Sequence, residues 1–468
     1  MHLLFERFLF GLGAVDIHIE ASILKKQFII RTFTMDPLRT IQLFYWLLLL
    51  PAFQSYANPS TSKDSGQRYY DNVMGSVPYL PANLSDTFIS CPLSNPTSKI
   101  MDNQYRTSKQ VNYQDANWEL RIAADWDYFN SSSAQGRILA IDFQQRSQGL
   151  AYRYLGNDQT YDQLYEPWSS SKIMAFTAAV AKARQSGVGA NSLAGNTPLA
   201  DLITSIHSYQ PFGKADANSN AIATYFLNTV GRNAATGLFH QDWLKLANPR
   251  VRFRGSYAVK VFKPTTPIWQ SNTTTNKVTM PELAKGSDDP GYQAYRCEEC
   301  GLTGNKPMTT LAEAEWLKRL ASHERDKLTR QPHIQASDIE VLFYGTGHSD
   351  PKHQVGGMLQ GIGLMLSRAV ANGIAEKQVE NPKALLDEVT QGKWRIWQKS
   401  GSGPSETRGT GESVVLAHVC LPHYQGGREF TIAAQTSVAG EGESSVGRAG
   451  MKMQVLLNQA MSQLLKSN

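Results

Sequence analysis

The 468-residue chain lacks features that mark several protein classes. After residue 57 it has no apolar run near the roughly 20 residues that a transmembrane helix needs, so we expect no stable membrane span in the mature protein. It carries 46 Lys and Arg against 40 Asp and Glu, with no basic cluster interleaved with aromatic residues. This composition gives no indication of a nucleic-acid partner.

Cysteine is scarce, with only four residues, Cys91, Cys297, Cys300 and Cys420. An even number permits disulfides in an exported protein, and pairing of Cys91 with Cys420 is arithmetically possible. A zinc site would need two ligands besides Cys297 and Cys300, and no second Cys-x-x-Cys or His-x-x-x-His pair occurs. We therefore expect no metal and no other cofactor, and the sequence leaves the disulfide pairing open.

Three common catalytic templates are also absent. The chain has no Gly-x-Ser-x-Gly elbow, no His-Glu-x-x-His zinc helix and no Gly-x-x-x-x-Gly-Lys phosphate loop. Its ten histidines follow no pattern, so each is expected to be a surface or core residue rather than a catalytic base.

The first 57 residues have the pattern of a targeting segment. Met35-Asp36-Pro37-Leu38-Arg39 precedes an apolar run over 41–53, and Ser55-Tyr56-Ala57 is a small-x-small cleavage pattern. This order is typical of a secretory signal peptide, with translation expected to start at Met35, and the apolar run is short for a membrane anchor. We expect an exported protein, periplasmic or secreted, for which residues 1–57 are dispensable.

A candidate nucleophile lies in the segment Glu166-Pro167-Trp168-Ser169-Ser170-Ser171-Lys172. Ser169 and Lys172 are three residues apart, so at a helix start both side chains project from one face of the first turn. A lysine whose pKa is lowered by burial or by other cations can take the serine proton. The alternative is that these serines only cap the helix, because the spacing alone is common. The run Ile173–Val180 is apolar nearly all round, which predicts a buried central helix.

Hydrophobic patterns predict the architecture. Residues 58–116 are polar and without periodicity, and we interpret them as a lead-in segment before a hydrolase domain over 117–468. Helical patterns dominate from 173 to about 386, and an amphipathic helix over 451–465 closes the chain. Strand patterns occur at 138–143, 150–155, 394–399, 413–419 and 429–435. These predict an α/β fold of the α+β type, with an antiparallel sheet flanked by helices and a helical lobe.

A second motif, Lys399-Ser400-Gly401-Ser402-Gly403, directly follows one of these predicted strands. A lysine at a strand end beside small residues offers a cation, a hydroxyl and exposed backbone donors. Such a group suits a substrate carboxylate or an extended peptide. A glycine-rich hairpin turn with a solvated lysine is the alternative interpretation.

Together the two motifs resemble those of the penicillin-recognising serine hydrolases, which include class A β-lactamases and D-alanyl-D-alanine peptidases. That family carries Ser-x-x-Lys at the start of a central helix and Lys-Thr/Ser-Gly on a sheet edge. Ser169-x-x-Lys172 and Lys399-Ser400-Gly401 stand in the same order and the same predicted contexts. The resemblance covers about residues 117 to 466 and implies a β-lactamase/transpeptidase-like fold. It implies Ser169 as nucleophile and Lys172 as its base, with substrate bound by Lys399, Ser400, Gly401 and Ser402.

The family's middle motif, Ser-Asp-Asn, is matched only in part. Counting back from Val230-Gly231 places Asn220 on the family's asparagine and Asn218 on its serine. This register keeps an amide for substrate and lysine but loses the hydroxyl that relays a proton to the leaving nitrogen. The other register uses Ser219 as the serine and puts Ala221 on the asparagine, and a plain helix cap is a further alternative. We prefer the first register.

The carboxylate that would activate water for deacylation is the least defined residue. Pro281-Glu282-Leu283 resembles the neighbourhood of the class A glutamate, and Met308-Thr309-Thr310-Leu311 resembles the helix start that follows it. The stretch between them is longer than in the family, so Glu282 is equally well interpreted as an ordinary surface carboxylate. Without a carboxylate that positions water, the acyl-enzyme would persist, as in a peptidase or a penicillin-binding protein.

The expected function is that of an exported serine hydrolase that forms an acyl-enzyme through Ser169. Its substrate would be a small β-lactam or a D-alanyl peptide of peptidoglycan, a choice that the motifs leave open. One alternative is a serine-dependent amidase of the glutaminase type on the same fold, which the Lys399-Ser400-Gly401 motif disfavours. Another is a non-catalytic peptidoglycan-binding relative, which the altered middle motif and the unusually long stretch after Glu282 favour.

Overall fold

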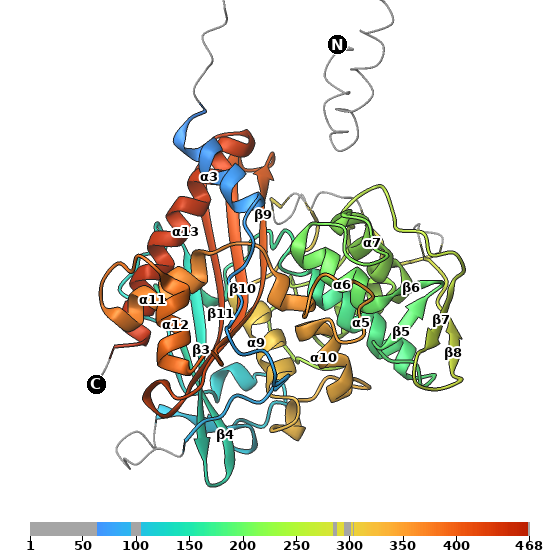
Figure 1. Cartoon of the computed structure of the whole chain (residues 1–468), viewed down its shortest axis with the longest axis horizontal. Helices are drawn as coiled ribbons and strands as arrows, with labels where there is room; N and C mark the ends of the chain where they lie inside the picture. The colour runs from blue at the N-terminus through green and yellow to red at the C-terminus, as the bar shows by residue number, and fades with distance from the viewer. Residues whose placement is uncertain (1–62, 95–103, 284–287, 294–300, 303, 467–468) are drawn as a thin grey trace, which may run out of the picture. The chain divides into compact units, whose positions relative to one another are not determined.

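An antiparallel sheet built from both ends of the chain organises the computed structural model (Figure 1). Its hydrogen-bonded order is β1-β4-β3-β11-β10-β9, and the short β2 pairs with β4 in parallel. The strands are β1 Arg106–Thr107, β2 Ala124–Asp125, β3 Arg137–Arg146, β4 Gly149–Gly156, β9 Arg395–Ser405, β10 Thr410–Leu421 and β11 Arg428–Ala439. The early hairpin and the late strands therefore share one sheet, as predicted.

The structure describes residues 63–94, 104–283, 288–293, 301–302 and 304–466, all within the unit Lys63–Asn468. The predicted signal peptide, the expected start at Met35, Cys297 and Cys300 lie outside the described residues. In the described part of the chain, no helix combines the length and the apolar character needed to cross a membrane.

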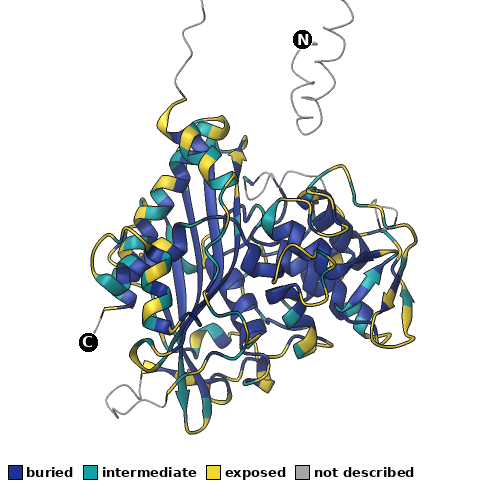
Figure 2. Cartoon of the chain, viewed as in Figure 1, coloured by how far each residue is buried: buried dark blue, intermediate teal, exposed yellow. Residues whose placement is uncertain are grey.

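The sheet is buried on both faces, because helices cover each of them (Figure 2). Side chains alternate along β3: Ile138 and Ala140 join one hydrophobic cluster, and Leu139 and Ile141 join the other. The helices α11 (Met365–Ala375) and α13 (Gly442–Leu464) cover the first face, and α9 (Thr310–Ala321) covers the second. Burying each large aliphatic side chain in this way contributes roughly 1.5–3 kcal/mol.

The helical lobe lies beside the sheet and has the central helix α5 (Lys172–Arg184) at its core (Figure 1). Its other elements are α6 Leu199–Ser208, α7 Ser219–Val230, α8 Arg232–Gly237, α10 Ala336–Tyr344 and η5 Gly357–Gln360, whereas α12 Pro382–Thr390 packs beside α11. The lobe also holds a small sheet that the sequence patterns did not predict, in the order β6-β5-β7-β8. Its strands are β5 Ser192–Ala194, β6 Thr197–Pro198, β7 Ile268–Ser271 and β8 Lys277–Thr279. They are too short for an alternating pattern to stand out.

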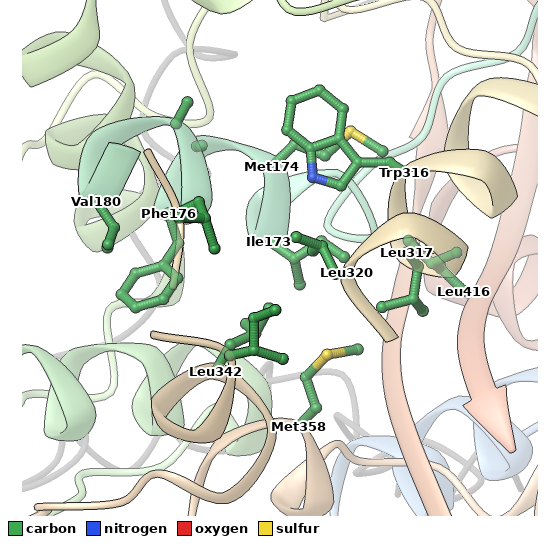
Figure 3. Close-up of a cluster of buried hydrophobic side chains, with 14 of the residues drawn as sticks. Ile173, Met174, Phe176, Val180, Trp316, Leu317, Leu320, Leu342, Met358 and Leu416 are labelled. Atoms are coloured by element: carbon green, nitrogen blue, oxygen red, sulfur yellow. The ribbon is translucent and has the colours of Figure 1, made fainter. Parts of the chain in front are cut away.

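Helix α5 is surrounded by apolar side chains, which confirms the prediction of a buried central helix. Ile173, Met174 and Phe176 are all fully buried. Figure 3 shows them among Trp316, Leu317 and Leu320 of α9, Leu342 of α10, Met358 of η5 and Leu416 of β10. Because α5 packs both on helices of its own lobe and on α9 and β10 of the sheet region, its first turn is held in a fixed position relative to the sheet.

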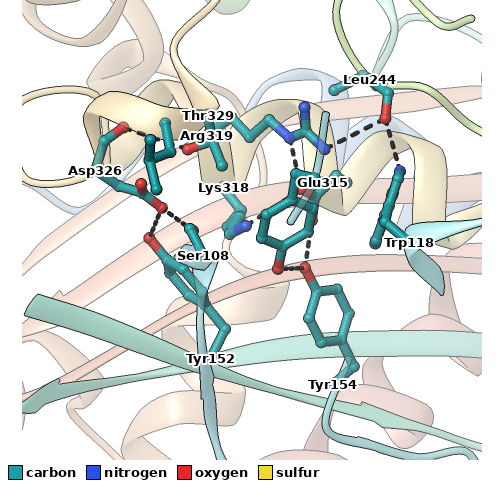
Figure 4. Close-up of polar contacts among 12 residues, drawn as sticks. Ser108, Trp118, Tyr152, Tyr154, Leu244, Glu315, Lys318, Arg319, Asp326 and Thr329 are labelled. Atoms are coloured by element: carbon teal, nitrogen blue, oxygen red, sulfur yellow. Dashed lines mark hydrogen bonds and ion pairs between the residues drawn. The ribbon is translucent and has the colours of Figure 1, made fainter. Parts of the chain in front are cut away.

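A buried polar network joins α9 to strand β4 of the sheet (Figure 4). The carboxylate of Glu315 accepts hydrogen bonds from Arg319 Nε at 2.6 Å, Lys318 Nζ at 3.2 Å and the Tyr154 hydroxyl at 2.6 Å. The Lys318 ammonium also lies 3.9 Å from the centroid of the Tyr152 ring. Buried charges need such partners, so this network fixes α9 against β4.

The lead-in segment is integrated into the fold from Lys63 onward. Helix α3 (Ser65–Met74) packs on α13, and β1 pairs with β4. The chain between them runs beside β9, where Phe88 packs edge-on against Trp397 (Figure 1). A disulfide between Cys91 and Cys420 ties this segment to the end of β10, the strand beside the edge strand β9. The pairing that the sequence left open therefore involves the two cysteines farthest apart in the chain.

The predicted α+β arrangement, an antiparallel sheet flanked by helices beside a helical lobe, is confirmed, while three element boundaries differ. Lys399, Ser400 and Gly401 lie inside β9 rather than after its end, because β9 continues to Ser405. The last helix begins at Gly442, ahead of its amphipathic stretch. Ser169 lies in the turn before α5, whose first residue is Lys172.

The disulfide yields a stability prediction. Cys91 and Cys420 are separated by 329 residues, and a cross-link that closes so long a loop strongly restricts the unfolded chain. We expect the double variant Cys91→Ala/Cys420→Ala to lose about 2–5 kcal/mol of unfolding free energy in urea titrations under oxidising conditions. A reductant should lower the stability of the wild type but not that of the double variant. Equal midpoints for the two oxidised proteins would refute the prediction.

Candidate active site

The turn before α5 presents Ser169. The Lys172 N–H donates to the Ser169 carbonyl at 3.2 Å, and the Ser170 N–H donates to the Pro167 carbonyl at 3.1 Å. Trp168, just before Ser169, has a φ of 52°, a left-handed conformation that is unusual for a bulky residue. Its indole N–H donates to the Glu412 carboxylate at 2.9 Å, which holds the ring in place. Strain of this kind is typical of residues that present a functional group.

Lys172 is fully buried at the start of α5. Its Nζ donates to the Ser219 hydroxyl at 2.9 Å and to Asn220 Oδ1 at 2.6 Å. Burial lowers the pKa of the Lys172 amine well below its usual range, and the nearby Lys306 ammonium adds to this effect. Lys172 is therefore suited to be a neutral amine that can accept a proton near neutral pH.

Lys399 on β9 belongs to the same cluster. It is fully buried, and its Nζ has no hydrogen-bond partner in the described part of the chain. The face of the Tyr209 ring contacts both lysines, at 3.9 Å from Lys399 Nζ and 5.3 Å from Lys172 Nζ, measured to the ring centroid. Burial lowers the pKa of Lys399 well below its usual range, and the charge of Lys172 lowers it further.

Strand β9 passes directly beside the Ser169 turn. A Cβ at Gly401 would stand 2.7 Å from the Ser169 nitrogen and 2.5 Å from the Pro167 carbonyl oxygen, so only glycine allows this approach. The Ser400 hydroxyl donates to the Ile362 carbonyl at 3.2 Å, and Ser402 is exposed. The structure therefore brings the segment from Lys399 to Ser402 together with Ser169 and Lys172.

The middle motif is placed differently from the preferred register. Asn218 is the N-cap of α7, where its side chain accepts from the Ala221 N–H. Asn220 contacts Lys172 and is exposed on its other side, as the first register requires. The hydroxyl that contacts Lys172 belongs to Ser219, the residue between Asn218 and Asn220 in the sequence. The same hydroxyl donates to the Ile206 carbonyl. Each register therefore supplied one of the two contacts.

Glu282 lies apart from this cluster. Its carboxylate accepts from Asn228 Nδ2 at 3.0 Å and pairs with Lys263 Nζ at 2.5 Å. Asn228 is two helical turns beyond Asn220 on α7, about 12 Å along the axis at 1.5 Å per residue. Thr309 does cap α9, as the resemblance to the family's helix start implied.

Two other carboxylates near the Ser169 turn, those of Glu313 and Glu166, are bound to groups other than the two lysines. Glu313 of α9 is buried and accepts from the Ser170 hydroxyl and, at 2.8 Å, from the Tyr165 hydroxyl. Glu166 accepts from the Gly304 N–H at 2.7 Å and lies 3.7 Å from Lys306 Nζ. In the described residues, no carboxylate forms a hydrogen bond or ion pair with Lys172 or Lys399.

Sequence reasoning missed Tyr209, which contacts both lysines. It follows α6 in a loop without any recognisable motif, and an aromatic residue there has no pattern that indicates a role. The second register uses Ser219, but it puts Ala221 on the family's asparagine and therefore loses the amide that the first register keeps. The signal that could have found it is the adjacent pair Ser219-Asn220 at a helix start, where both side chains can reach back to α5.

Comparisons with known proteins give a likeness in structure only. No known protein-family profile matches the sequence, and no curated protein matches it. A β-lactamase from Streptosporangium roseum is similar at 15% identity and a TM-score of 0.36, over 71% of this chain and 95% of that protein. A β-lactamase from Xanthomonas campestris pv. campestris is similar at 11% identity and a TM-score of 0.36, over 71% and 93%.

Penicillin-binding protein PBP-A is similar at 9% identity and a TM-score of 0.36, over 70% of this chain and 89% of that protein. The similar solved structures are thus class A β-lactamases and PBP-A, the group whose motifs the sequence resembles. At these TM-scores the likeness supports no statement about chemistry, which depends instead on the side chains of the site.

Glu313 yields a pH prediction. Burial raises the pKa of Glu313 to about 8 from its ordinary 4.5, and the hydrogen bonds from Ser170 and Tyr165 oppose the rise. The stabilising contribution of the neutral acid is complete below pH 4.5 and is lost as the pH rises to about 8, at up to ~1.4 kcal/mol per pH unit.

The variant Glu313→Gln, which stays neutral, should therefore gain stability relative to the wild type between pH 5 and pH 8. Urea unfolding at several pH values in this range measures the difference. Parallel curves for the two proteins would show that Glu313 is already ionised in the fold.

Proposed function

We propose that the chain is an exported serine hydrolase of the β-lactamase/penicillin-binding type, which forms an acyl-enzyme through Ser169 on a β-lactam or a D-alanyl peptide. The observation that carries the proposal is the lysine pair. Lys172 and Lys399 lie buried around one tyrosine ring beside the Ser169 turn, without a carboxylate partner in the described residues. Such a site is suited to deprotonate a hydroxyl and to receive an anion.

Acylation begins when the neutral amine of Lys172 takes the proton of the Ser169 hydroxyl and Ser169 Oγ bonds to the substrate carbonyl carbon. Ser219 and Asn220 keep the amine in place through the two hydrogen bonds that it donates. Asn220 is exposed on its free side, so its amide can also hydrogen-bond the substrate.

The negative oxygen of the tetrahedral intermediate needs two donors. We assign the backbone N–H of Ser169 and that of Ser402, the residue after Gly401 on β9. The close approach of Gly401 to the Ser169 turn supports this assignment, because it draws the two segments together. A side chain at position 401 would push them apart.

Lys399 and Ser400 would bind the substrate carboxylate. An ammonium that is buried without a hydrogen-bond partner is unfavourable until an anion arrives, so binding a carboxylate there is strongly favoured. Both β-lactams of the penicillin type and D-alanyl peptides carry a carboxylate next to the scissile amide. Glutamine, the substrate of the alternative amidase, does not carry one there.

Deacylation should be slow. Glu282 is bound to Asn228 and Lys263, and no described carboxylate contacts Lys172. Among the described residues, a water at the ester would therefore find no base of the kind that a β-lactamase supplies. This favours the behaviour of a penicillin-binding protein or peptidase over that of an efficient β-lactamase.

The first test is covalent labelling. We expect a fluorescent penicillin to label wild-type protein on Ser169, and intact-mass spectra to show an adduct that lasts for many minutes. Ser169→Ala should abolish labelling, whereas Ser171→Ala should retain it, since the Ser171 hydroxyl bonds to Tyr257 instead. A wild-type protein that is neither labelled by the penicillin nor able to hydrolyse it would contradict the proposal.

The second test concerns Lys399. Lys399→Met should raise the penicillin concentration needed for half-maximal acylation by about 10- to 100-fold, the loss of one charge-assisted contact. The penicillin methyl ester, which has no carboxylate, should react with variant and wild type at similar rates in a stopped-flow assay. A uniform loss with both compounds would mean that Lys399 supports the fold of the site instead.

A further inference from the structure

A third buried lysine, Lys306, shares an aromatic ring with Lys172. The centroid of the Tyr257 ring lies 4.9 Å from Lys306 Nζ and 5.6 Å from Lys172 Nζ. Both amines are thus within cation–π range of one ring. Charges this close interact through the protein interior, where water screens them poorly.

Lys306 is held in place as an ammonium. Its Nζ donates to the Ser256 and Gly304 carbonyls, both at 2.9 Å, and lies 3.7 Å from Glu166 Oε1. A Cβ at Gly304 would collide with both charged groups, so only glycine allows this packing. Burial lowers the pKa of Lys306, but the Glu166 carboxylate raises it again. Lys172 has no such carboxylate partner among the described residues, so Lys306 is the lysine that keeps its proton more readily.

The segment that carries Lys306 is fixed to the segment that leads into the Ser169 turn. The Met308 N–H donates to the Tyr165 carbonyl at 3.1 Å, and the Tyr165 N–H donates to the Met308 carbonyl at 2.9 Å. Glu166, the carboxylate partner of Lys306, directly follows Tyr165 in the sequence. The position of the Lys306 charge relative to the turn is therefore set by the backbone as well as by the ion pair.

Substrate binding creates a difficulty for the proposed base. A substrate carboxylate that binds Lys399 cancels the positive charge of that ammonium. Lys399 and Lys172 lie close enough to repel each other, so this neutralisation removes one of the charges that keep Lys172 unprotonated. A protonated Lys172 could not accept the Ser169 proton. The base therefore needs a second cation whose charge the substrate does not cancel.

We propose that Lys306 is a positioning residue whose fixed charge keeps Lys172 a neutral base after a substrate carboxylate has bound Lys399, an inference that rests on the function proposed above. Lys306 acts through Lys172 and does not touch the reacting atoms. Its ammonium is bound to two backbone carbonyls and paired with Glu166, so its charge is the same before and after substrate binding.

Other titratable groups surround the two lysines. Those that face Lys172, besides Lys306, are Lys399, His207, Tyr209 and Tyr257, and those that face Lys306 are Glu166, Arg232 and Tyr257. Burial raises the pKa of both tyrosines and lowers that of His207 to about 3, so these three do not change charge near neutral pH. Glu313, which binds Ser170, has a pKa of about 8, so a test must observe Lys172 directly.

The deciding measurement is the protonation midpoint of the Lys172 amine. NMR of protein with nitrogen-15 in its lysine side chains reports it, and Lys172→Arg assigns the signal. The background is Ser169→Ala, which can bind penicillin but not form the ester. There Lys306→Gln should raise the midpoint by about one pH unit, the repulsion of two unit charges about 10 Å apart in protein. The rise should be present with penicillin bound as well as without it.

Two further variants separate charge from structure. Glutamine keeps amide donors for the Ser256 and Gly304 carbonyls, and Lys306→Arg, which keeps the charge, should leave the midpoint in place. Lys182→Gln is the matched control, because Lys182 Nζ also donates to a backbone carbonyl, that of Thr229 at 2.7 Å. Lys182 is ten residues along α5, about 15 Å along the axis, so its loss should not move the midpoint. Equal midpoints with and without Lys306→Gln in the penicillin-bound protein would overturn the proposal.

Acylation kinetics with Ser169 intact supply the second readout. In Lys306→Gln the acid limb of the penicillin profile should move to higher pH, with acylation about tenfold slower below both midpoints and equal to the wild-type rate above them. A loss by one factor at every pH would mean that Lys306 only supports the loop, and would overturn the proposal. Lys306→Met takes the place of Lys306→Gln if the latter folds poorly.

The two proposals fail in different ways. A wild-type protein that penicillin does not acylate would overturn the proposed function, whereas the NMR midpoints would still report whether Lys306 acts on Lys172. A wild-type protein that is acylated on Ser169, with a Lys172 midpoint that Lys306→Gln does not move, would overturn only the role of Lys306.

Discussion

Two buried lysines that share one aromatic ring form the constraint on which this site depends. Lys172 and Lys399 are both fully buried, and within the described residues neither is paired with a carboxylate. Charged ammonium groups in such a place would each be unfavourable by several kcal/mol. The protein accommodates them by lowering their pKa values, by hydrogen-bonding Lys172 to Ser219 and Asn220, and by packing both ammonium groups against the Tyr209 ring. In the proposed reaction, the incoming substrate supplies the missing negative charge.

The nucleophile turn is the second part of this arrangement, and it is held from three directions. Trp168 is anchored to Glu412 of β10, Gly401 of β9 lies against the backbone of the turn, and Glu313 of α9 binds Ser170 from below. Helix α9 is itself fixed to the sheet through Glu315 and its partners. A strained backbone persists only when its surroundings determine it in this way.

Those parts of the fold and site that have a strong local pattern could be predicted from the sequence. The alternating strands indicated the central sheet, the apolar run after Lys172 indicated the buried helix, and Ser169, Lys172 and Lys399 stood out as motifs. The small sheet of β5 to β8 was missed because strands of two to four residues carry no period. The Ser219 hydroxyl, the remote position of Glu282 and the Cys91–Cys420 pairing depend on tertiary contacts, which single-sequence patterns do not encode. Tyr209 is the clearest case, because its contact with both lysines arises only in the folded protein.

The disulfide and the sheet order together affect when this protein can fold during its synthesis. Strand β3 near the start of the domain pairs with β11 near its end, and the sulfur bridge spans 329 residues. A domain with such distant pairings folds slowly, since its first strands must wait for the last ones to leave the ribosome. An unfinished chain therefore cannot complete its central sheet, because β9, β10 and β11 come from its last 74 residues. The same topology that unites the two lysines thus delays completion of the domain until its final strands have been made.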